Sequence, residues 1–475
     1  MKIKVKLLIL SIIIYSSLQA QKNKKSILSE LDTRSEKYAS IAQEIWGLAE
    51  MGYQETKSSS LLQKTLKDEG FKIETGVANI PTAFIAEYGS GYPVIAILGE
   101  FDALPGLSQK AIPEKVSNGA TAGHACGHHL FGTASSAAAI AVKDWMKANN
   151  VIGTIRFYGC PAEEGGGAKV YMSREGLFND VDIALHWHPS SQNAASAAAA
   201  LANISAKFRF YGVSAHAAGA PEMGRSSLDG VEAMNTMVNM MREHIPQEAR
   251  IHYVITDGGK APNVVPDFAE VYYYARHNRR DVVRNIFERI VKTAEGAALG
   301  TETTMKYEIV NGVHELLPNL TLQKLVHTNL TEIGGIIYTD EEKEFGKKIA
   351  LSLGQKSLNE ARALEVQPYK ETARAYGSTD VGDVSFVVPT VGFGTATWVP
   401  GTPAHSWQAV AAGGTSIGNK GMMVAAKTLT ATAIDLFTNQ NLIKKAKIEF
   451  EEKRGKDFVY KPLLGDRPPA LDYRK

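Results

Sequence analysis

Five short motifs in the chain carry side chains that can hold a transition metal. Thiolate, imidazole and carboxylate groups are the ligands that proteins offer to zinc and similar first-row metals. Three of the motifs begin where a predicted strand stops, which is where ligand sites gather in a parallel sheet. The motifs lie at 99–105 (GEFDALP), 123–129 (GHACGHH), 160–167 (CPAEEGGG), 186–189 (HWHP) and 401–407 (GTPAHSW).

The spacing within these motifs suits hydrolysis assisted by metal ions. Cys126 and His128 are separated by one glycine, so both can present a donor from a single turn. Glu163 and Glu164 are adjacent, so one carboxylate can bind a metal while the other handles protons. A metal-bound water has its pKa lowered to about 7, and a nearby carboxylate can take its proton as the water attacks a carbonyl. Two metals about 3.5–4 Å apart would hold the water and the carbonyl oxygen together.

Each motif alone has an ordinary structural explanation. A single histidine is often a plain hydrogen-bonded residue, and two adjacent glutamates usually lie on a solvated surface. The glycines at 165–167 could form a phosphate loop, but the Lys-Ser/Thr of a Walker motif is missing. The recurrence of all these residue types at loop positions of one sheet favours the metal site over the separate explanations.

The elements around the motifs predict an α/β fold. Apolar strand-like runs alternate with helical stretches from about 27 to 200, most clearly at 92–99, 132–148, 153–159 and 181–187. Such alternation predicts a parallel sheet covered on both faces. The same style returns at 315–440, with expected elements at 319–333, 387–393 and 420–437. The tail at 441–475 is rich in lysine and then contains prolines, which predicts a surface helix followed by an extended end.

Residues 201–314 follow a different pattern. Strands and helices are expected in the order βαββαβ, the ferredoxin-like arrangement, which makes this segment an inserted second domain. The expected elements are 208–211, 227–244, 250–256, 270–276, 281–299 and 303–310. A chain of 475 residues also exceeds what one hydrophobic core usually organises, so two domains are expected from length alone.

The composition is that of a soluble globular protein, with 44% hydrophobic and 21% charged residues. A formal net charge of +2 and the lack of a basic stripe interleaved with aromatics give no reason to expect nucleic acid as a partner. With only Cys126 and Cys160, and one of them in a metal-like motif, the chain is no disulfide scaffold.

The N-terminus predicts a secretory signal peptide at 1–20. Three lysines precede a short apolar run at 7–15, which leads into 16–20 (SSLQA) with a small residue, Ala20, at the cleavage point. The run is too short to span a bilayer comfortably, although an uncleaved anchor is the alternative because Leu18 fits the cleavage pattern poorly. We therefore expect a periplasmic or secreted protein without membrane contact once the signal is removed.

The motifs resemble those of the aminoacylase, carboxypeptidase G and hippurate hydrolase superfamily of dinuclear metallohydrolases. They are most similar to its amidohydrolase branch, and within it to the group formed by the B subunits of aminobenzoyl-glutamate hydrolases. The resemblance runs from about Trp46 to Asp472 and is especially specific from 377–385 (GSTDVGDVS) to 420–422 (KGM). It implies two divalent metal ions, zinc or manganese, in the α/β domain, and it implies that the inserted domain serves as a dimerisation domain or lid.

The resemblance also assigns roles to the motif residues. Glu163 would be the general base, and Asp102 would orient a ligand histidine. The metal ligands it implies are Cys126, His128, Glu164, His188 and His405. His186 competes with His188, because both would face the same side of a regular strand and periodicity does not choose between them. The family pattern, counted from Asp182, favours His188.

Four residues of the inserted domain are candidates for contacting the substrate. In the family, the counterpart of His216 reaches the site of a neighbouring subunit and helps to hold the developing oxyanion, which would make a dimer necessary for activity. Asn263 matches another such polar contact, although a turn beside two prolines also explains it. Arg225 and Arg276 can bind a substrate carboxylate with two hydrogen bonds. Arg276 could equally form an ion pair between domains.

The expected function is metal-dependent hydrolysis of the amide bond in an N-acyl amino acid, such as an aminobenzoyl-glutamate-like compound. A dipeptidase or other exopeptidase with the same site is one alternative. A non-catalytic subunit of a hetero-oligomeric amidohydrolase is another, which the complete set of ligands and base argues against. We expect a homodimer, with a homologous partner subunit as the second possibility. The signal peptide sets the chain apart from cytosolic relatives that act on folate breakdown products, so the physiological substrate stays open.

Overall fold

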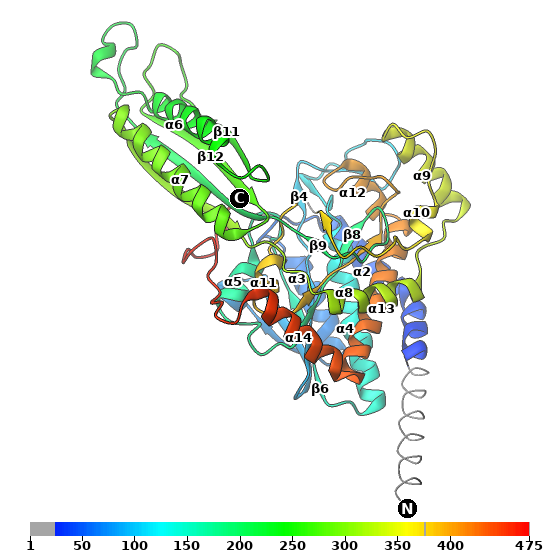
Figure 1. Ribbon diagram of the computed structural model, residues 1–475. Helices are drawn as coiled ribbons and strands as arrows, with labels where there is room; N and C mark the ends of the chain where they lie inside the picture. Colours follow the sequence, from blue (N-terminus) through cyan, green and yellow to red (C-terminus); the bar gives the residue numbers. More distant parts are fainter. Residues whose placement is uncertain (1–23, 375–376, 475) are drawn as a thin grey trace, which may run out of the picture.

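The computed structural model describes residues 24–374 and 377–474, so the predicted signal peptide lies outside the described residues. Figure 1 shows a main domain from which an elongated inserted domain projects. Among the helices of the described part, none is long and apolar enough to cross a membrane.

The main domain is organised around a six-stranded sheet with the order β1-β2-β6-β3-β7-β15. Its strands are β1 (Lys72–Thr75), β2 (Phe84–Ser90), β3 (Val94–Gly99), β6 (Gly153–Gly159), β7 (Ile183–Leu185) and β15 (Thr390–Val391). β6, β3, β7 and β15 run parallel, which confirms the predicted α/β fold. β1 and β2 are antiparallel, contrary to the expectation of a wholly parallel sheet. The connection between them, residues 76–83, is too short for the crossover that parallel strands need.

Helices cover both faces of this sheet. Side chains of β3 alternate between two cores, with Ile95 and Ile97 in one and Ala96 and Leu98 in the other. The helices of the first core include α2 (Ser35–Leu48), α3 (Thr56–Asp68), α4 (His128–Asn149), α8 (Leu320–Ile333), α13 (Ser416–Thr438) and α14 (Gln440–Arg454). Those of the second core are α5 (Ala168–Arg174) and α11 (Val381–Ser385).

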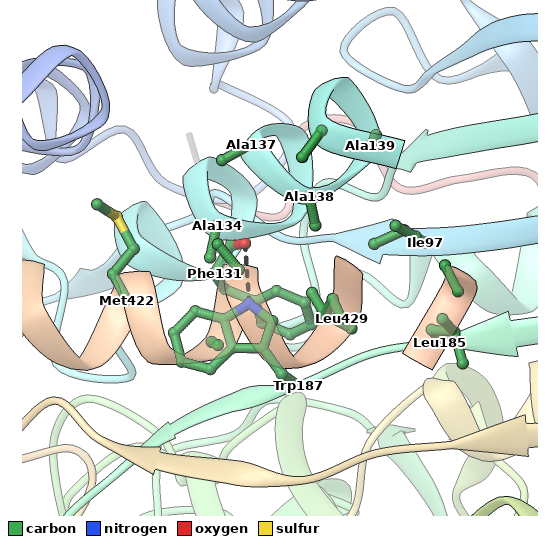
Figure 2. Close-up of a cluster of buried hydrophobic side chains, with 14 of the residues drawn as sticks. Ile97, Phe131, Ala134, Ala137, Ala138, Ala139, Leu185, Trp187, Met422 and Leu429 are labelled. Carbon is green, nitrogen blue, oxygen red and sulfur yellow. Dashed lines mark hydrogen bonds between the residues drawn. The ribbon is translucent and has the colours of Figure 1, made fainter. Parts of the chain in front are cut away.

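Small side chains let α4 pack closely within the first core. Figure 2 shows Ala134 and Ala138 of α4 among Leu429 of α13, Ile97 of β3 and the large ring of Trp187. The Trp187 indole donates a hydrogen bond to the carbonyl oxygen of Phe131 at 3.2 Å, which ties the segment after β7 to the first turn of α4. Because α4 begins at His128, this packing fixes where a motif residue lies relative to the sheet.

The inserted domain has the predicted ferredoxin-like topology. Its antiparallel sheet has the order β11-β12-β10-β13, and two helices pack on one of its faces. The elements are β10 (Ala202–Tyr211), α6 (Ser227–Met241), β11 (Arg250–Asp257), β12 (Phe268–His277), α7 (Arg280–Gly300) and β13 (Thr304–Val313). Alternate residues of each strand, such as Phe208 and Phe210, point into the core under the helices. The opposite face is polar, and there Arg209 pairs with Glu270 and Glu308.

Two predicted strands of the main domain are shorter than expected. Strands were predicted at 181–187 and 387–393, but only Ile183–Leu185 and Thr390–Val391 pair in the main sheet. Both segments then leave this sheet and pair with each other in a separate two-stranded ladder. That ladder joins β8 (His188–Ser190) to β16 (Gly394–Ala396). Further elements of the main domain are the short β4 (Leu104–Pro105), β5 (Ala122–Gly123), β9 (Ala198–Ala199), β14 (Ala373–Arg374), α10 (Ala361–Leu364) and α12 (Trp407–Gly413), and the longer helix α9 (Asp340–Ser352).

The extended end that follows α14 is packed against both domains at Leu463 and Leu464. Leu463 is buried in the core of the inserted domain, and Leu464 is buried in the second core of the main domain. The chain after α14 therefore bridges the two domains.

Candidate metal centre

The predicted ligands meet beyond the carboxyl ends of the parallel strands in two groups that share one residue. Cys126, His128 and His188 form the first group, and Cys126, Glu164 and His405 form the second. Within each group the ligand atoms lie within 4.8 Å of one another. Cys126 would therefore be the ligand that the two groups have in common.

A tight turn presents Cys126 and His128, as their spacing predicts. Gly127 between them has a φ of 76°, a conformation that glycine adopts without strain. A Cβ at Gly127 would also lie 2.6 Å from Pro189. His405 likewise has a positive φ, 59°, and its backbone N–H donates to the carbonyl oxygen of Ala125 at 2.9 Å. The second ligand group is thus tied to the turn that carries the first.

The structure places His188 rather than His186 beside Cys126. Main-sheet pairing of β7 stops at Leu185, and His188 Nε2 lies 3.4 Å from Cys126 Sγ. His188 Nδ1 faces the carbonyl oxygen of Pro189 at 2.7 Å, so it carries the proton and leaves the Nε2 lone pair for a metal. His186 lies outside both groups among the described residues, with its Nε2 packed against Gly392.

Asp102 holds two parts of the centre at once. Its Oδ1 lies 2.8 Å from His128 Nδ1, and its Oδ2 accepts the backbone N–H of Glu164 at 2.9 Å. The first contact orients the imidazole so that Nε2 faces the ligand group. The resemblance implied that Asp102 orients a ligand histidine, and the structure places its carboxylate against His128.

A buried cation lies behind the ligands, and the sequence did not reveal it. Lys169 Nζ is 2.7 Å from carboxylate oxygens of both Glu100 and Asp380, and all three side chains are buried. Burial alone would lower the pKa of Lys169, but the two carboxylates raise it well above its usual range. Glu100 also approaches His128 Nε2 at 3.1 Å, so the network reaches the first ligand group.

Glu163 lies beside this network in a position suited to handling a proton. One of its oxygens lies within 4.8 Å of ligand atoms of Glu100 and His128. Burial, together with the Glu100 and Glu164 carboxylates, raises the pKa of Glu163 well above its usual range. A carboxylate with a raised pKa is a better proton acceptor near neutral pH than an ordinary glutamate.

The donor set fits two divalent metal ions. His128 Nε2 lies 3.1 Å from Glu100 Oε2, and Glu164 Oε1 lies 3.0 Å from His405 Nε2, but both of these buried atoms lack a well-formed hydrogen bond in the described part of the chain. Such orphaned atoms are rare unless another group satisfies them, and a cation would do so here. Burial raises the pKa of the Cys126 thiol, and coordination to a metal would deprotonate it. Sulfur, nitrogen and carboxylate donors together are a set that first-row divalent metals accept.

His216 and Asn263 lie together in the inserted domain, far from these ligands in the same chain. His216 is exposed in the loop between β10 and α6 and forms a bridge with Val264, and Ala217 N–H donates to the carbonyl oxygen of Asn263 at 3.0 Å. β10 starts next to the main domain and extends for about 30 Å at 3.3 Å per residue, so this loop lies at the far end of the inserted domain (Figure 1).

The two predicted arginines have partners inside the inserted domain. Arg225 pairs with Glu302 and donates to the carbonyl oxygen of Gly224 at 2.7 Å, so its guanidinium is largely engaged. The Arg276 guanidinium lies 5.1 Å from the centre of the Tyr274 ring, and its Nε is buried without a hydrogen-bond partner among the described residues. Arg276 thus keeps donors for a ligand, whereas Arg225 keeps few.

The loop 160–167 has further supports that no motif revealed. Glu55, which is fully buried, accepts the backbone N–H of Ala162 at 2.8 Å, and the Tyr53 hydroxyl donates to the carbonyl oxygen of Gly166 at 2.8 Å. Ala162 has a φ of 55°, which a residue other than glycine adopts only when its surroundings enforce it. Glu55 comes soon after α2 in the sequence, and only the folded structure shows that its buried carboxylate binds the backbone of this loop.

Comparisons with known proteins agree with the centre. The chain is 43% identical over 468 residues to the B subunit of p-aminobenzoyl-glutamate hydrolase from Escherichia coli (strain K12), covering 93% of this chain and 97% of that protein. It is 28% identical to the Xaa-Arg dipeptidase of Mus musculus, covering 90% of this chain and 92% of that protein. Residues 201–302 match the model of the peptidase dimerisation domain.

A solved structure shows the same fold. It is that of a dinuclear metal-binding peptidase of the M20 family from Bacillus subtilis, with a TM-score of 0.57 and 17% sequence identity. The match covers 87% of this chain and 99% of that one. The chain therefore belongs to the M20 family, in the group of the p-aminobenzoyl-glutamate hydrolase B subunits, and is a metallopeptidase-like hydrolase of amide bonds.

Proposed function

We propose that this chain hydrolyses the amide bond of an N-acyl amino acid of the aminobenzoyl-glutamate type, with two zinc or manganese ions bound. The observation that carries the proposal is the pair of ligand groups joined through Cys126, with the Glu163 carboxylate beside them. The 43% identity to the B subunit of a p-aminobenzoyl-glutamate hydrolase supports the choice of substrate class.

The bound ions would polarise the amide carbonyl and lower the pKa of the attacking water. Glu163 takes the proton from this water and passes it to the leaving nitrogen. Asp102 keeps His128 in place throughout, since its carboxylate holds both the imidazole and the Glu164 backbone. Lys169 offsets the charge of Glu100 and Asp380 behind the ligands, which reduces the cost of burying these two carboxylates.

His216 completes the site from a neighbouring subunit in this proposal. Its Nδ1 accepts the backbone N–H groups of Ala218 at 3.2 Å and Gly219 at 3.0 Å. The neutral imidazole therefore carries its proton on Nε2, which is the form that can donate to a developing oxyanion. The match to a peptidase dimerisation domain and the distance of this loop from its own metal ligands both support a homodimer.

A substrate panel separates hydrolysis of acyl-amino acids from hydrolysis of dipeptides. The purified protein is stripped of metal, reloaded with zinc or manganese, and assayed for amino-acid release from acyl-glutamates, other acyl-amino acids and dipeptides. We expect the acyl-glutamates to react with the highest kcat/KM. Faster hydrolysis of dipeptides would favour the exopeptidase alternative, which the 28% identity to a dipeptidase supports.

The non-catalytic alternative is tested with Glu163→Gln. This change keeps the side-chain shape and removes the base, so we expect kcat to fall by a factor of at least about 10² while two metals remain bound. Activity that survives unchanged in an assembly containing this variant would place the chemistry on another chain. Export is proposed from the apolar run at 7–15 and is checked by fractionating cells that express the full chain.

A further inference from the structure

The last described residues of the chain return to the loop that carries Glu163 and Glu164. The Tyr473 hydroxyl donates to the carbonyl oxygen of Glu164 at 3.0 Å, and Arg474 Nη2 donates to the same oxygen at 2.9 Å. This peptide is also held from its other side, where Asp102 accepts the Glu164 N–H at 2.9 Å. The backbone of a predicted metal ligand is thus fixed by three side chains.

The loop needs such external supports because its own sequence is permissive. Residues 165–167 are three consecutive glycines, which lose more conformational freedom on folding than other residues. The backbone N–H groups of Gly166 and Gly167 donate to the carbonyl oxygen of Ala162 and close the loop on itself, whereas the Glu164 carbonyl oxygen receives no backbone N–H from the described residues. Tyr473 and Arg474 supply the hydrogen-bond donors for this carbonyl oxygen.

The surroundings of Tyr473 are shaped to admit its ring. A Cβ on Gly52 would lie 2.1 Å from the Tyr473 hydroxyl oxygen, so only glycine leaves room for this contact. The rings of Tyr53 and Tyr473 meet edge to face with centres 5.6 Å apart, and Tyr53 holds another carbonyl of the loop, that of Gly166. Arg474 stacks on the Tyr473 ring at 4.9 Å. Two tyrosines and an arginine therefore brace nearby carbonyls of one loop.

The segment that delivers Tyr473 is anchored in both domains. Leu463 and Leu464 are buried in the two separate cores, and Arg467 donates to the carbonyl oxygen of Val310 in β13 at 2.7 Å. Closer to the centre, Gln54 donates to the carbonyl oxygen of Leu471 at 3.1 Å. The end of the segment is therefore positioned by the fold and is not a loose appendage.

We propose that Tyr473 and Arg474 are positioning residues that hold Glu164 in the second ligand group and Glu163 in reach of the attacking water. Their loss frees the Glu164 carbonyl, and the glycine-rich loop then relaxes away from Cys126 and His405. The first ligand group, formed by Cys126, His128 and His188, lies outside the loop that this segment braces and keeps its metal. The catalytic part of this inference rests on the proposed function, whereas the metal-binding part does not.

The test is a metal titration of Tyr473→Phe, Arg474→Ala and the double variant in the full chain. Manganese is added to metal-free protein, and the two binding steps are resolved by calorimetry. Reference variants identify the steps, since His188→Ala weakens the first group alone and His405→Ala the second alone. We expect the double variant to weaken the second step by about 10- to 100-fold, the usual cost of losing partners that orient a ligand. The first step should change little.

Controls separate positioning from general stability. Asp472→Ala alters the exposed neighbour of Tyr473 and should leave both steps and the unfolding temperature unchanged. Arg474→Lys retains a donor and should recover part of the second-step affinity. At saturating manganese, the double variant should lose kcat on an acyl-glutamate by about tenfold or more, with little change in KM.

Two outcomes overturn the proposal. Equal weakening of both steps together with a lower unfolding temperature would show that the segment only stabilises the fold. Unchanged titrations in the double variant would show that its contacts with Glu164 do not position the loop. Because the titration uses no substrate, it decides the matter even if the wild-type protein fails to hydrolyse acyl-amino acids.

Discussion

Asp102 and His128 form a buried pair in which the carboxylate Oδ1 lies 2.8 Å from the imidazole Nδ1. Because Oδ2 of the same carboxylate accepts the Glu164 N–H, Asp102→Asn can satisfy only one of these two donors. We expect the variant to lose about 10- to 100-fold in metal affinity or kcat/KM. Asp182→Asn is the matched control, since Asp182 is a buried carboxylate that accepts a backbone N–H, that of Val94, away from the ligands. Equal effects of the two changes would contradict the orienting role.

Metal stoichiometry tests the choice between the two histidines that flank Trp187. His188→Ala should reduce bound metal from two equivalents toward one, because His188 belongs to the first ligand group. His186→Ala should retain both metals, because the His186 ring packs against Gly392 outside the groups. Elemental analysis of dialysed protein measures the difference. Loss of metal from the His186 variant alone would reverse the assignment.

Mixing two inactive variants tests whether His216 of the partner subunit completes the site. His216→Ala and Glu163→Gln are each expected to be inactive as homodimers. In a mixed dimer, one of the two sites has both an intact Glu163 and an intact His216. Random reassociation makes about half of the dimers mixed, and each mixed dimer has one working site of two, so about one quarter of wild-type activity should return. The activity is measured after the subunits are dissociated and refolded together. If the mixture stays inactive although mixed dimers have formed, His216 acts in its own chain or not at all.

A buried carboxyl outside the centre should make stability depend on pH. Burial raises the pKa of Asp383 to about 7, although it accepts hydrogen bonds from Tyr460 and from the His314 backbone. Between about pH 4 and pH 7 the folded state then holds a proton that the unfolded state has lost, so the free energy of unfolding falls as the pH rises. At about 1.4 kcal/mol per pKa unit, this component is on the order of 4 kcal/mol.

Asp383→Asn removes that component. Denaturant unfolding at pH 5 and pH 8 should give a smaller difference between the two conditions for the variant than for the wild type. Asp340→Asn, at a fully exposed position, should show the wild-type difference. An unchanged pH dependence in Asp383→Asn would mean that Asp383 is ionised in the folded state across this range.

Local patterns were enough to predict much of the fold and the ligand turn. Cys126 and His128 lie within three residues, so the turn that presents them depends on Gly127 and little else. The ferredoxin-like domain was predictable because its strands alternate between a core face and a polar face. The antiparallel direction of β2 at the edge of the main sheet was not predictable in this way. Strand direction depends on the length of the connection between strands, and the hydrophobic periodicity does not show where that connection begins and ends.

The parts that escaped prediction depend on contacts between distant positions. Lys169 resembles an ordinary surface lysine until Asp380, which is 211 positions away, folds against it. Tyr473 and Glu164 are 309 positions apart, and nothing in either local sequence indicates the other. The choice between His186 and His188 depended on where β7 leaves the main sheet, because a continuous strand would have turned both rings the same way.

The alanines of α4 have a consequence for the ligand at its start. A rigid helix transmits any displacement along its axis, so extra volume opposite Ala134 or Ala138 would move the His128 imidazole as well as the core. A small shift of His128 would break its contact with Asp102, because that contact is a single hydrogen bond of 2.8 Å. The small side chains of Ala134 and Ala138 therefore set how closely α4 packs against its neighbours, and with that the position of His128 at the start of the helix.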